Sequence, residues 1–347
     1  MNIETGAPPR ASADRAVRFD GTWQEFLPIA LTNLLLTIVT LGIYRFWAQA
    51  RVRRYLWSRT TIIDDELQWT GTGGEMFIGF LMVIGVLIAS VAAIFGIAYV
   101  VGEWFLFVGL LAFYVFIFWA VNFAQFRALR YRLSRTYWRG IRGGSEDNGV
   151  GYGWAAFGRF FIAGLTFGIM TPMAIVENWN DRMNAMSFGP HRFESHVTTE
   201  GLYLRWFAFL GSYFVGAIAL LAIVGSLGSE VGSVIGIAAF LLAMGLALAA
   251  FWALFFRKIA AQFEMGGLGA GFEVSTFEWI KFYAKIVGLT IVTLGFGALM
   301  WRFWRWQFVM DRLALYGEID LDLLTQSTTA APKDAEGFAD AFDIGAF

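Results

Sequence analysis

One seven-residue stretch occurs twice in this chain and constrains its architecture more than any other feature. Leu-Thr-Ile-Val-Thr-Leu-Gly stands at residues 36–42 and again at 289–295, and Arg-Phe-Trp follows each copy, at residues 45–47 and 302–304. A degraded copy, Leu-Thr-Phe-Gly-Ile-Met-Thr-Pro, lies between them at residues 165–172. An internal repeat indicates one structural unit used several times, with each unit packed against its neighbours. The sequence therefore predicts three copies of one helical unit.

The composition indicates the solvent in which these copies fold. Of the 347 residues, 58% are hydrophobic and only 15% are charged, whereas a soluble domain averages about 45–50% apolar and about 25% charged residues. A membrane protein is therefore expected. The net charge of −1 and the position of the basic clusters beside apolar segments argue against a nucleic-acid partner.

Four long apolar segments are candidates for membrane spans. They cover residues 76–101, 104–123, 206–227 and 234–255. Each exceeds or approaches the ~20 residues that a transmembrane helix needs. The first two are separated by Glu103 and the last two by a short turn with Glu230, so we predict two long transmembrane hairpins.

The three repeat copies are predicted to be helices that are broken within or near the bilayer. Glycine costs about 1 kcal/mol in a helix relative to alanine, and proline removes a backbone donor and clashes with the preceding turn. We place the breaks at Thr40 and Gly42, at Thr171 and Pro172, and at Thr293 and Gly295.

Charge near the membrane gives two alternatives for these broken elements. Lys and Arg favour the cytoplasmic side, and the loops at residues 45–59, 127–142 and 257–285 are basic, whereas both hairpin turns lack basic residues. All basic loops lie on one side if the middle copy enters and leaves on the cytoplasmic side, as a re-entrant element. Seven conventional spans are the alternative, because the charge rule is sometimes overridden.

The predicted fold is an all-α polytopic membrane protein. It has two long transmembrane hairpins, three repeated broken (TLG/TP) helical elements, and short β-turn elements at the cytoplasmic surface. We divide the chain into a disordered tail (1–18), membrane repeat 1 (19–142), membrane repeat 2 (151–265), a partial repeat 3 (272–320) and a second disordered tail (325–347).

A basic and aromatic helix follows the first break. Trp47, Arg51, Arg53, Arg54 and Trp57 lie within it. Tryptophan and arginine at a membrane interface commonly serve as anchors. The more specific interpretation is a site for the headgroup of an anionic lipid, formed by the three arginines.

A polar cluster follows the middle break. Glu177, Asn178 and Asp181 come directly after Pro172, and transporters bind cations beside broken helices. These residues are therefore candidates for a substrate or ion path. The alternative is an interfacial polar helix whose side chains cap backbone groups.

The sequence offers little for catalysis or for metal binding. There is no cysteine, and the two histidines, His191 and His196, have no third partner of their kind. No paired carboxylates lie inside a span, so we expect neither catalytic residues, nor a metal site, nor a cofactor, and we do not expect an enzyme.

The stretch from Thr40 to Leu56, Thr-Leu-Gly-Ile-Tyr-Arg-Phe-Trp-Ala-Gln-Ala-Arg-Val-Arg-Arg-Tyr-Leu, resembles the hallmark of the YjgN family, also called DUF898. Residues 69–73, Trp-Thr-Gly-Thr-Gly, and residues 77–80, Phe-Ile-Gly-Phe, are similar to that family too. The resemblance covers about residues 19–320 and departs from the hallmark at Pro172 and at residues 177–181. It implies a bacterial inner-membrane protein and supplies no catalytic residues.

Two functional hypotheses remain. A transport- or channel-like protein would use the broken repeats to line a polar path. A membrane scaffold or anionic-lipid-binding protein would instead grip the inner leaflet through its basic aromatic helices. Repetition with broken helices favours the first, and the shortage of intramembrane polar groups favours the second. From the sequence we expect the transport- or channel-like protein and keep the scaffold or lipid-binding protein as the alternative. We expect membrane lipids, anionic ones above all, as partners. We also expect multi-pass insertion in the inner membrane and a cytoplasmic C-terminus, and a homo-oligomer is compatible with the small residues in the spans.

Overall fold

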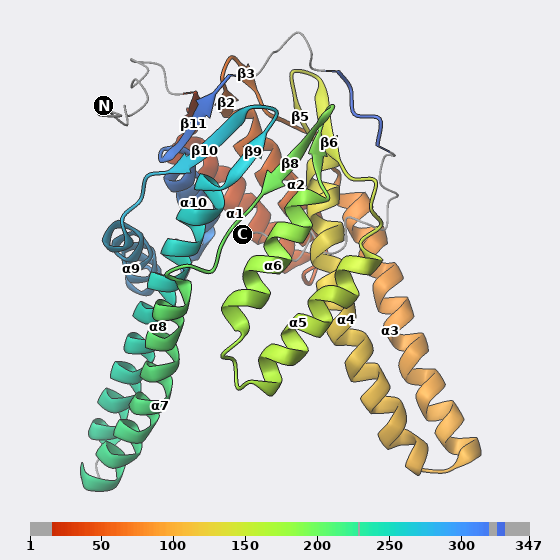
Figure 1. Cartoon of the computed structure of the whole chain (residues 1–347), viewed down its shortest axis with the longest axis vertical. Helices are drawn as coiled ribbons and strands as arrows, with labels where there is room; N and C mark the ends of the chain where they lie inside the picture. The colour runs from red at the N-terminus through yellow and green to blue at the C-terminus, as the bar shows by residue number, and fades with distance from the viewer. Residues whose placement is uncertain (1–15, 228–229, 319–324, 330–347) are drawn as a thin grey trace, which may run out of the picture.

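Four long helices form two hairpins that point the same way (Figure 1). The structure is a computed structural model and describes residues 16–227, 230–318 and 325–329. Within these ranges four helices have the length and composition to cross a membrane. They are α3 (Gly73–Val101), α4 (Trp104–Arg135), α7 (Leu202–Leu227) and α8 (Glu230–Ala261). At 1.5 Å per residue the 29 residues of α3 extend over about 44 Å, more than the ~30 Å hydrocarbon core. The predicted pair of long hairpins is confirmed.

An antiparallel sheet covers the end of the molecule from which the hairpins extend. Its eight strands follow the order β11-β10-β9-β8-β7-β6-β5-β4. The bounds are β4 Gln68–Trp69, β5 Thr136–Trp138, β6 Ile141–Gly144, β7 Ser187–Phe188, β8 His191–Ser195, β9 Phe263–Met265, β10 Leu268–Phe272 and β11 Leu313–Gly317. A smaller sheet of order β1-β2-β3 contains β1 Val17–Phe19, β2 Thr60–Ile62 and β3 Asp65–Glu66.

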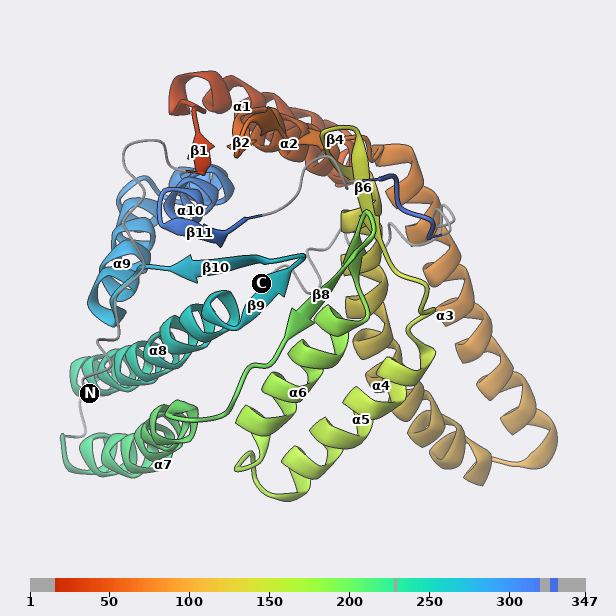
Figure 2. The ribbon, with the colours of Figure 1, turned by 45° about the horizontal axis from the view of Figure 1, so that its top comes forward.

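The sheet corrects the all-α prediction, which allowed only short β-turn elements. The strands of the two sheets have two to five residues, and most of them are shorter than the four or more residues over which alternation identifies a strand in a sequence. Several neighbours in the sheet lie far apart in the chain, as in the pairing of β8 with β9, which the hairpin of α7 and α8 separates. Figure 2 shows the strands following an arc, so that β11 returns to lie near β1.

Three pairs of shorter helices lie beneath the sheet. They are α1 (Trp23–Val39) with α2 (Arg45–Ser58), α5 (Val150–Leu165) with α6 (Thr171–Asn184), and α9 (Thr276–Val292) with the 3-10 turn η1 (Phe296–Met300) and α10 (Trp301–Met310). Strand β6 precedes α5, strand β7 follows α6, and these two strands are hydrogen-bonded neighbours. The middle pair therefore leaves the sheet and returns to it, which is the path that a re-entrant element requires.

The same turn closes each helix pair, and the repeated threonine and glycine form it. The amide of Gly42 donates to the carbonyl of Thr37 at 2.7 Å, and Gly295 donates to Thr290 at the same distance, a bond that spans five residues as at helix C-termini with a left-handed cap. Gly42 has φ +92° and Gly295 has φ +96°, in the region that favours glycine. The hydroxyl of Thr40 donates to the Leu36 carbonyl and accepts from the Tyr44 amide, so it serves both helices.

The structure places the middle turn five residues before the predicted break. Thr166 accepts from the Met170 amide, and Gly168 has φ +84° and donates to the Ala163 carbonyl at 2.7 Å. Thr171 and Pro172 instead begin α6, where proline fits because its missing amide has no helical acceptor there. The prediction of a break at Thr171 and Pro172 is therefore corrected to Thr166 and Gly168.

The first and last helix pairs pack against each other. Phe26 of α1 lies 5.3 Å from Phe303 of α10 between ring centroids, and Trp57 of α2 stacks on Trp306 of α10 at 4.4 Å. A buried cluster that includes Phe126, Trp138 and Met186 lies between α4, α6 and the sheet. The helix pairs thus surround a central space beneath the sheet.

Structured residues extend into both predicted tails. Val17 and Arg18 belong to β1 and pair with β2, so the expected tail through residue 18 is corrected. Ser327 and Thr329 are buried, and Gln326 donates to the Gly140 carbonyl. Residues 1–15 and 330–347 lie outside the described residues. The repeat boundaries remain a prediction.

Candidate functional site

The predicted ion-path residues are already occupied by an arginine of the neighbouring helix. Arg159 of α5 pairs with Glu177 at 2.8 Å and with Asp181 at 2.6 Å, and donates to Oδ1 of Asn178 at 2.8 Å. These contacts join α5 to α6 and supply the acceptors with a cation from the same chain. Within the described residues no group of three His, Cys, Asp or Glu side chains is arranged to hold a metal. The ion pairs of Arg159 connect the two helices of the pair.

The structure separates the residues of the predicted headgroup site. Arg51 and Arg54 are exposed on one face of α2, while Arg53 lies on the opposite face and is 5% exposed, because each residue of a helix turns by about 100°. Trp47 packs against Tyr44. Trp57 faces inward with Arg53, and its indole donates to Thr136 at 3.0 Å. Only Arg53 and Trp57 of the predicted set reach the central space.

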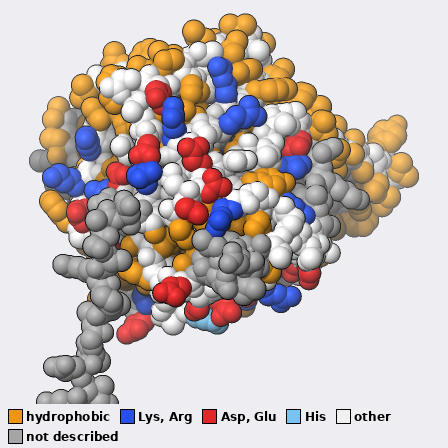
Figure 3. Space-filling model, turned by 90° about the horizontal axis from the view of Figure 1, so that it is seen from above, with side chains coloured by type: hydrophobic (Ala, Val, Ile, Leu, Met, Phe, Trp, Pro, Cys, Tyr) orange, Lys and Arg blue, Asp and Glu red, His pale blue; other side chains and the backbone are white. Residues whose placement is uncertain are grey.

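Arg53 and Trp57 line a cavity that we call the arginine chamber. Its volume is about 280 Å³, and it lies where α2, α4, α6 and α10 converge near the sheet. Five arginines line it, Arg53, Arg132, Arg182, Arg302 and Arg305, and its described lining includes no aspartate or glutamate. Figure 3 shows basic and acidic side chains interspersed on the outer face of the sheet end. The chamber beneath that face is thus charged with one sign only.

Arg182 is the arginine of the chamber whose hydrogen-bond donors are least satisfied by the described residues. It is 7% exposed, and its Nε and Nη1 have no hydrogen-bond partner among the described residues. Its guanidinium carbon lies 5.4 Å from the ring centroid of Trp179. Burial lowers the pKa of Arg182, and Tyr152 acts in the opposite direction. A guanidinium remains protonated in proteins even so, so the fold holds a buried positive charge with unsatisfied donors.

The other four arginines of the chamber have interaction partners within the protein. Arg53, Arg132, Arg302 and Arg305 each take part in other interactions, and Arg53 also lies over the ring of Trp69 at 4.9 Å. They add positive potential to the chamber. Arg182 supplies the unsatisfied donors. An anion with several acceptor oxygens, such as a phosphate or carboxylate, matches this combination.

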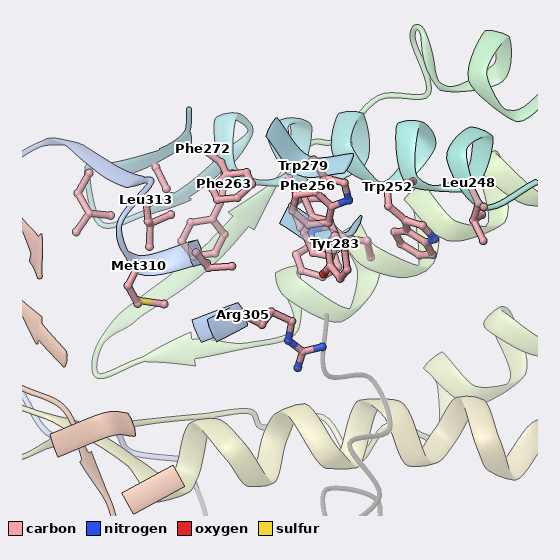
Figure 4. A pocket seen from close by; sticks show the side chains of 18 residues that line it. Leu248, Trp252, Phe256, Phe263, Phe272, Trp279, Tyr283, Arg305, Met310 and Leu313 are labelled. Atoms are coloured by element: carbon pink, nitrogen blue, oxygen red, sulfur yellow. The ribbon is translucent and has the colours of Figure 1, made fainter. Parts of the chain in front are cut away.

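A second and larger cavity adjoins the first, and we call it the apolar chamber. Its volume is about 690 Å³, and it shares Trp179, Arg305 and Val309 with the arginine chamber. Its walls come from α8, α9, α10 and strands β9 to β11. In Figure 4 the rings of Trp252, Phe256 and Trp279 gather along one side, and Arg305 lies apart from them. A charged chamber therefore opens beside an apolar one.

Sequence reasoning missed Arg182, Arg302 and Arg305. They come from helices far apart in the chain, and no local pattern brings them together. One signal was present in the sequence: Arg182 stands three residues after Trp179 on a helix, a spacing that places both on one face.

Comparison with known proteins gives a family and no solved relative. The family model described as "Bacterial protein of unknown function (DUF898)" matches residues 14–341. The inner membrane protein YjgN of Salmonella typhimurium is 38% identical over 76 residues, which cover 22% of this chain and 19% of that protein. YjgN of Escherichia coli K12 is 36% identical over 66 residues, 19% of this chain and 17% of that protein. The match thus spans about a fifth of these relatives. No solved structure matches.

Proposed function

We propose that this protein binds the anionic headgroup of a membrane amphiphile in the arginine chamber. The premise is that the chain belongs to the DUF898 family and is an integral inner-membrane protein. The observation that carries this proposal is Arg182, a buried guanidinium whose Nε and Nη1 lack hydrogen-bond partners among the described residues. Leaving a buried charge uncompensated is costly, and an anion in the chamber would offset that cost.

The chemistry of the lining selects the ligand. Guanidinium groups bind phosphate and carboxylate oxygens through paired hydrogen bonds. A bilayer presents such groups at the headgroup level, beside the ends of the spanning helices. We infer that the chamber lies near that level, because Arg132 and Thr136 belong to the basic end of α4, beyond its apolar segment.

The transport-like alternative has less support. It relied on Glu177, Asn178 and Asp181 as a cation path, and Arg159 occupies all three side chains. Lipid binding draws on Arg182, whose Nε and Nη1 lack hydrogen-bond partners among the described residues, so the geometry favours it over transport.

The test compares two arginines of similar chemistry and different burial. We expect Arg182→Gln to weaken retention of phosphatidylglycerol by the purified protein about 10- to 100-fold, since a hydrogen bond to a charged group contributes about 1.5–3 kcal/mol. Arg54→Gln, on the exposed face of α2, is the matched control and should change retention less than twofold.

Native mass spectrometry of the detergent-purified protein with phosphatidylglycerol and zwitterionic phosphatidylethanolamine gives the readout. Equal retention of both lipids by the unsubstituted chain, or equal losses in the two variants, would contradict the assignment of the chamber.

We also infer that the sheet faces the cytoplasm and that the C-terminus lies there. The basic loops gather at the sheet end, and the positive-inside rule assigns that end to the cytoplasm. The cysteine-free chain permits single Glu103→Cys and Glu264→Cys variants, at the far turn of one hairpin and on β9. A membrane-impermeant thiol reagent should label position 103 in intact spheroplasts and position 264 only after lysis. Labelling in the reverse order would overturn the orientation.

A further inference from the structure

We propose that the apolar chamber receives the hydrocarbon tail of the same ligand, so that the protein binds a single-chain anionic amphiphile with its headgroup among the arginines. This inference rests on the proposed function of the arginine chamber. It adds the class of ligand, because a headgroup site alone would accept any anionic lipid or a free phosphate.

The size and lining of the apolar chamber carry the first step. The chamber is partly open and has a volume of about 690 Å³. Sites for small molecules occupy about 300–1,000 Å³ and are lined mainly by apolar and aromatic side chains. Among the residues that line it, Arg305 alone carries a charge.

The shape of the chamber carries the second step. It follows α8 from Gly245 to Ala260, a distance of about 22 Å at 1.5 Å per residue. This suits an extended chain better than a compact ring system. Helix α8 is one of the four candidate spans, so the Gly245 end lies deeper along that span than the sheet end.

Continuity between the chambers carries the third step. Trp179, Arg305 and Val309 line both, so a headgroup beside Arg305 and Arg182 leaves its chain at the mouth of the apolar chamber. A polar occupant would leave the rings of Trp252 and Trp279 against water, whereas a hydrocarbon chain removes apolar surface from water on both sides.

The experiment measures affinity against chain length. Alkyl phosphates with 8 to 16 carbons would compete for the purified full-length protein, with bound species quantified by native mass spectrometry. Burying one methylene group is worth about fourfold in affinity. We therefore expect a rise of about fourfold for each added carbon, which stops when the chamber is full.

Two glycines give a matched pair of variants. A Cβ at Gly245 meets no atom within 4 Å, and the same is true of Gly211 on α7, which does not line the chamber. Gly245→Phe should fill the deep end and end the rise at a shorter chain, while Gly211→Phe should follow the unsubstituted protein. Arg182→Gln should lower affinity for every chain length by one common factor.

Each result separates the two proposals. Affinity independent of chain length, or identical curves for Gly245→Phe and Gly211→Phe, overturns the tail proposal even if Arg182→Gln still weakens binding. Equal affinity for alkyl phosphates and the corresponding alkyl alcohols overturns the headgroup proposal even if the chain-length dependence remains.

Discussion

Two arginines of the α5–α6 pair have opposite environments, although both belong to the same repeat. Arg159 has a side chain that is 22% exposed and contacts Glu177, Asp181 and Asn178. Arg182 is 7% exposed, stacks near Trp179 and has two nitrogen atoms without hydrogen-bond partners among the described residues. The better-solvated arginine has the counter-charges, and the buried one lacks them.

The difference separates two uses of the same side chain. An arginine that is needed only for folding should be paired when it is buried, because an unpaired buried charge is costly. Arg159 follows this expectation and stabilises the helix pair. Arg182 departs from it, and residues at functional sites are where stability is most often reduced in favour of binding. The substitutions below test this contrast, beginning with the largest expected effect.

Replacing Arg182 by an apolar residue should stabilise the protein in the absence of ligand. Arg182→Met keeps much of the side-chain volume beside Trp179 and removes the uncompensated charge. Replacement of buried charges by apolar residues gains about 1–4 kcal/mol in known cases, so we expect the thermal midpoint in lipid-free detergent to rise. Added phosphatidylglycerol should raise the midpoint of the unsubstituted chain and leave that of Arg182→Met unchanged. A lower midpoint for Arg182→Met in lipid-free detergent would show that Arg182 is a structural residue.

Removing the partners of Arg159 should act in the opposite direction. Glu177→Gln with Asp181→Asn leaves the shape intact and removes both counter-charges. Partly exposed ion pairs contribute up to about 1 kcal/mol each, so the unfolding free energy should fall by about 1–2 kcal/mol. Retention of anionic lipid should change less than twofold, because neither carboxylate lines a chamber. A large loss of lipid retention at unchanged stability would indicate that Glu177 and Asp181 belong to a binding site.

The long hairpins and the location of two turns follow directly from the sequence. Apolar runs of this length have few alternatives to spanning helices. The letters Thr-Leu-Gly mark a left-handed helix end because Gly42 and Gly295 adopt positive φ. The middle turn was misplaced because Pro172 is a stronger helix breaker than Gly168 by propensity, yet proline is also favoured at the first helical position.

The sheet and the arginine chamber could not be predicted because both depend on contacts between distant parts of the chain. Strand β8 depends for pairing on β9, which follows a complete spanning hairpin. Arg53 and Arg302 belong to different repeats and line the same cavity only in the folded structure. The basic residues of α2 appeared as one patch in the sequence, whereas the helix sends Arg53 inward and Arg51 outward.

Large apolar residues are exposed at the turns of the three helix pairs, whereas Arg182 is a buried charged residue. Leu41, Phe167 and Leu294 have φ between +51° and +53° and are 94%, 85% and 92% exposed. A left-handed conformation costs an ordinary residue about 1–2 kcal/mol, and each of these side chains is presented away from the protein. In an integral membrane protein, lipid chains are the surroundings that suit such side chains.

The smallest effect is expected at the turn that joins the helices of Arg159 and Arg182. Gly168 has φ +84°, and a Cβ there would approach Thr171 Oγ1 no closer than 3.7 Å, so strain comes from the backbone alone. Gly168→Ala should cost about 1 kcal/mol. Gly158→Ala, in the interior of α5 with open space around its Cβ, is the matched control and should gain about 0.5–1 kcal/mol.

Both alanine variants should retain anionic lipid as the unsubstituted chain does, because the carbonyl of Gly168 still accepts from the indole of Trp206 and Arg182 lies at the other end of α6. Thermal midpoints and lipid retention, measured for both variants, test whether the turn affects stability alone or lipid binding as well. If Gly168→Ala weakens lipid retention more than tenfold, the turn controls the position of Arg182. The two arginines would then not have separate roles, with Arg159 stabilising the helix pair and Arg182 binding the ligand, because a change at the turn would affect both.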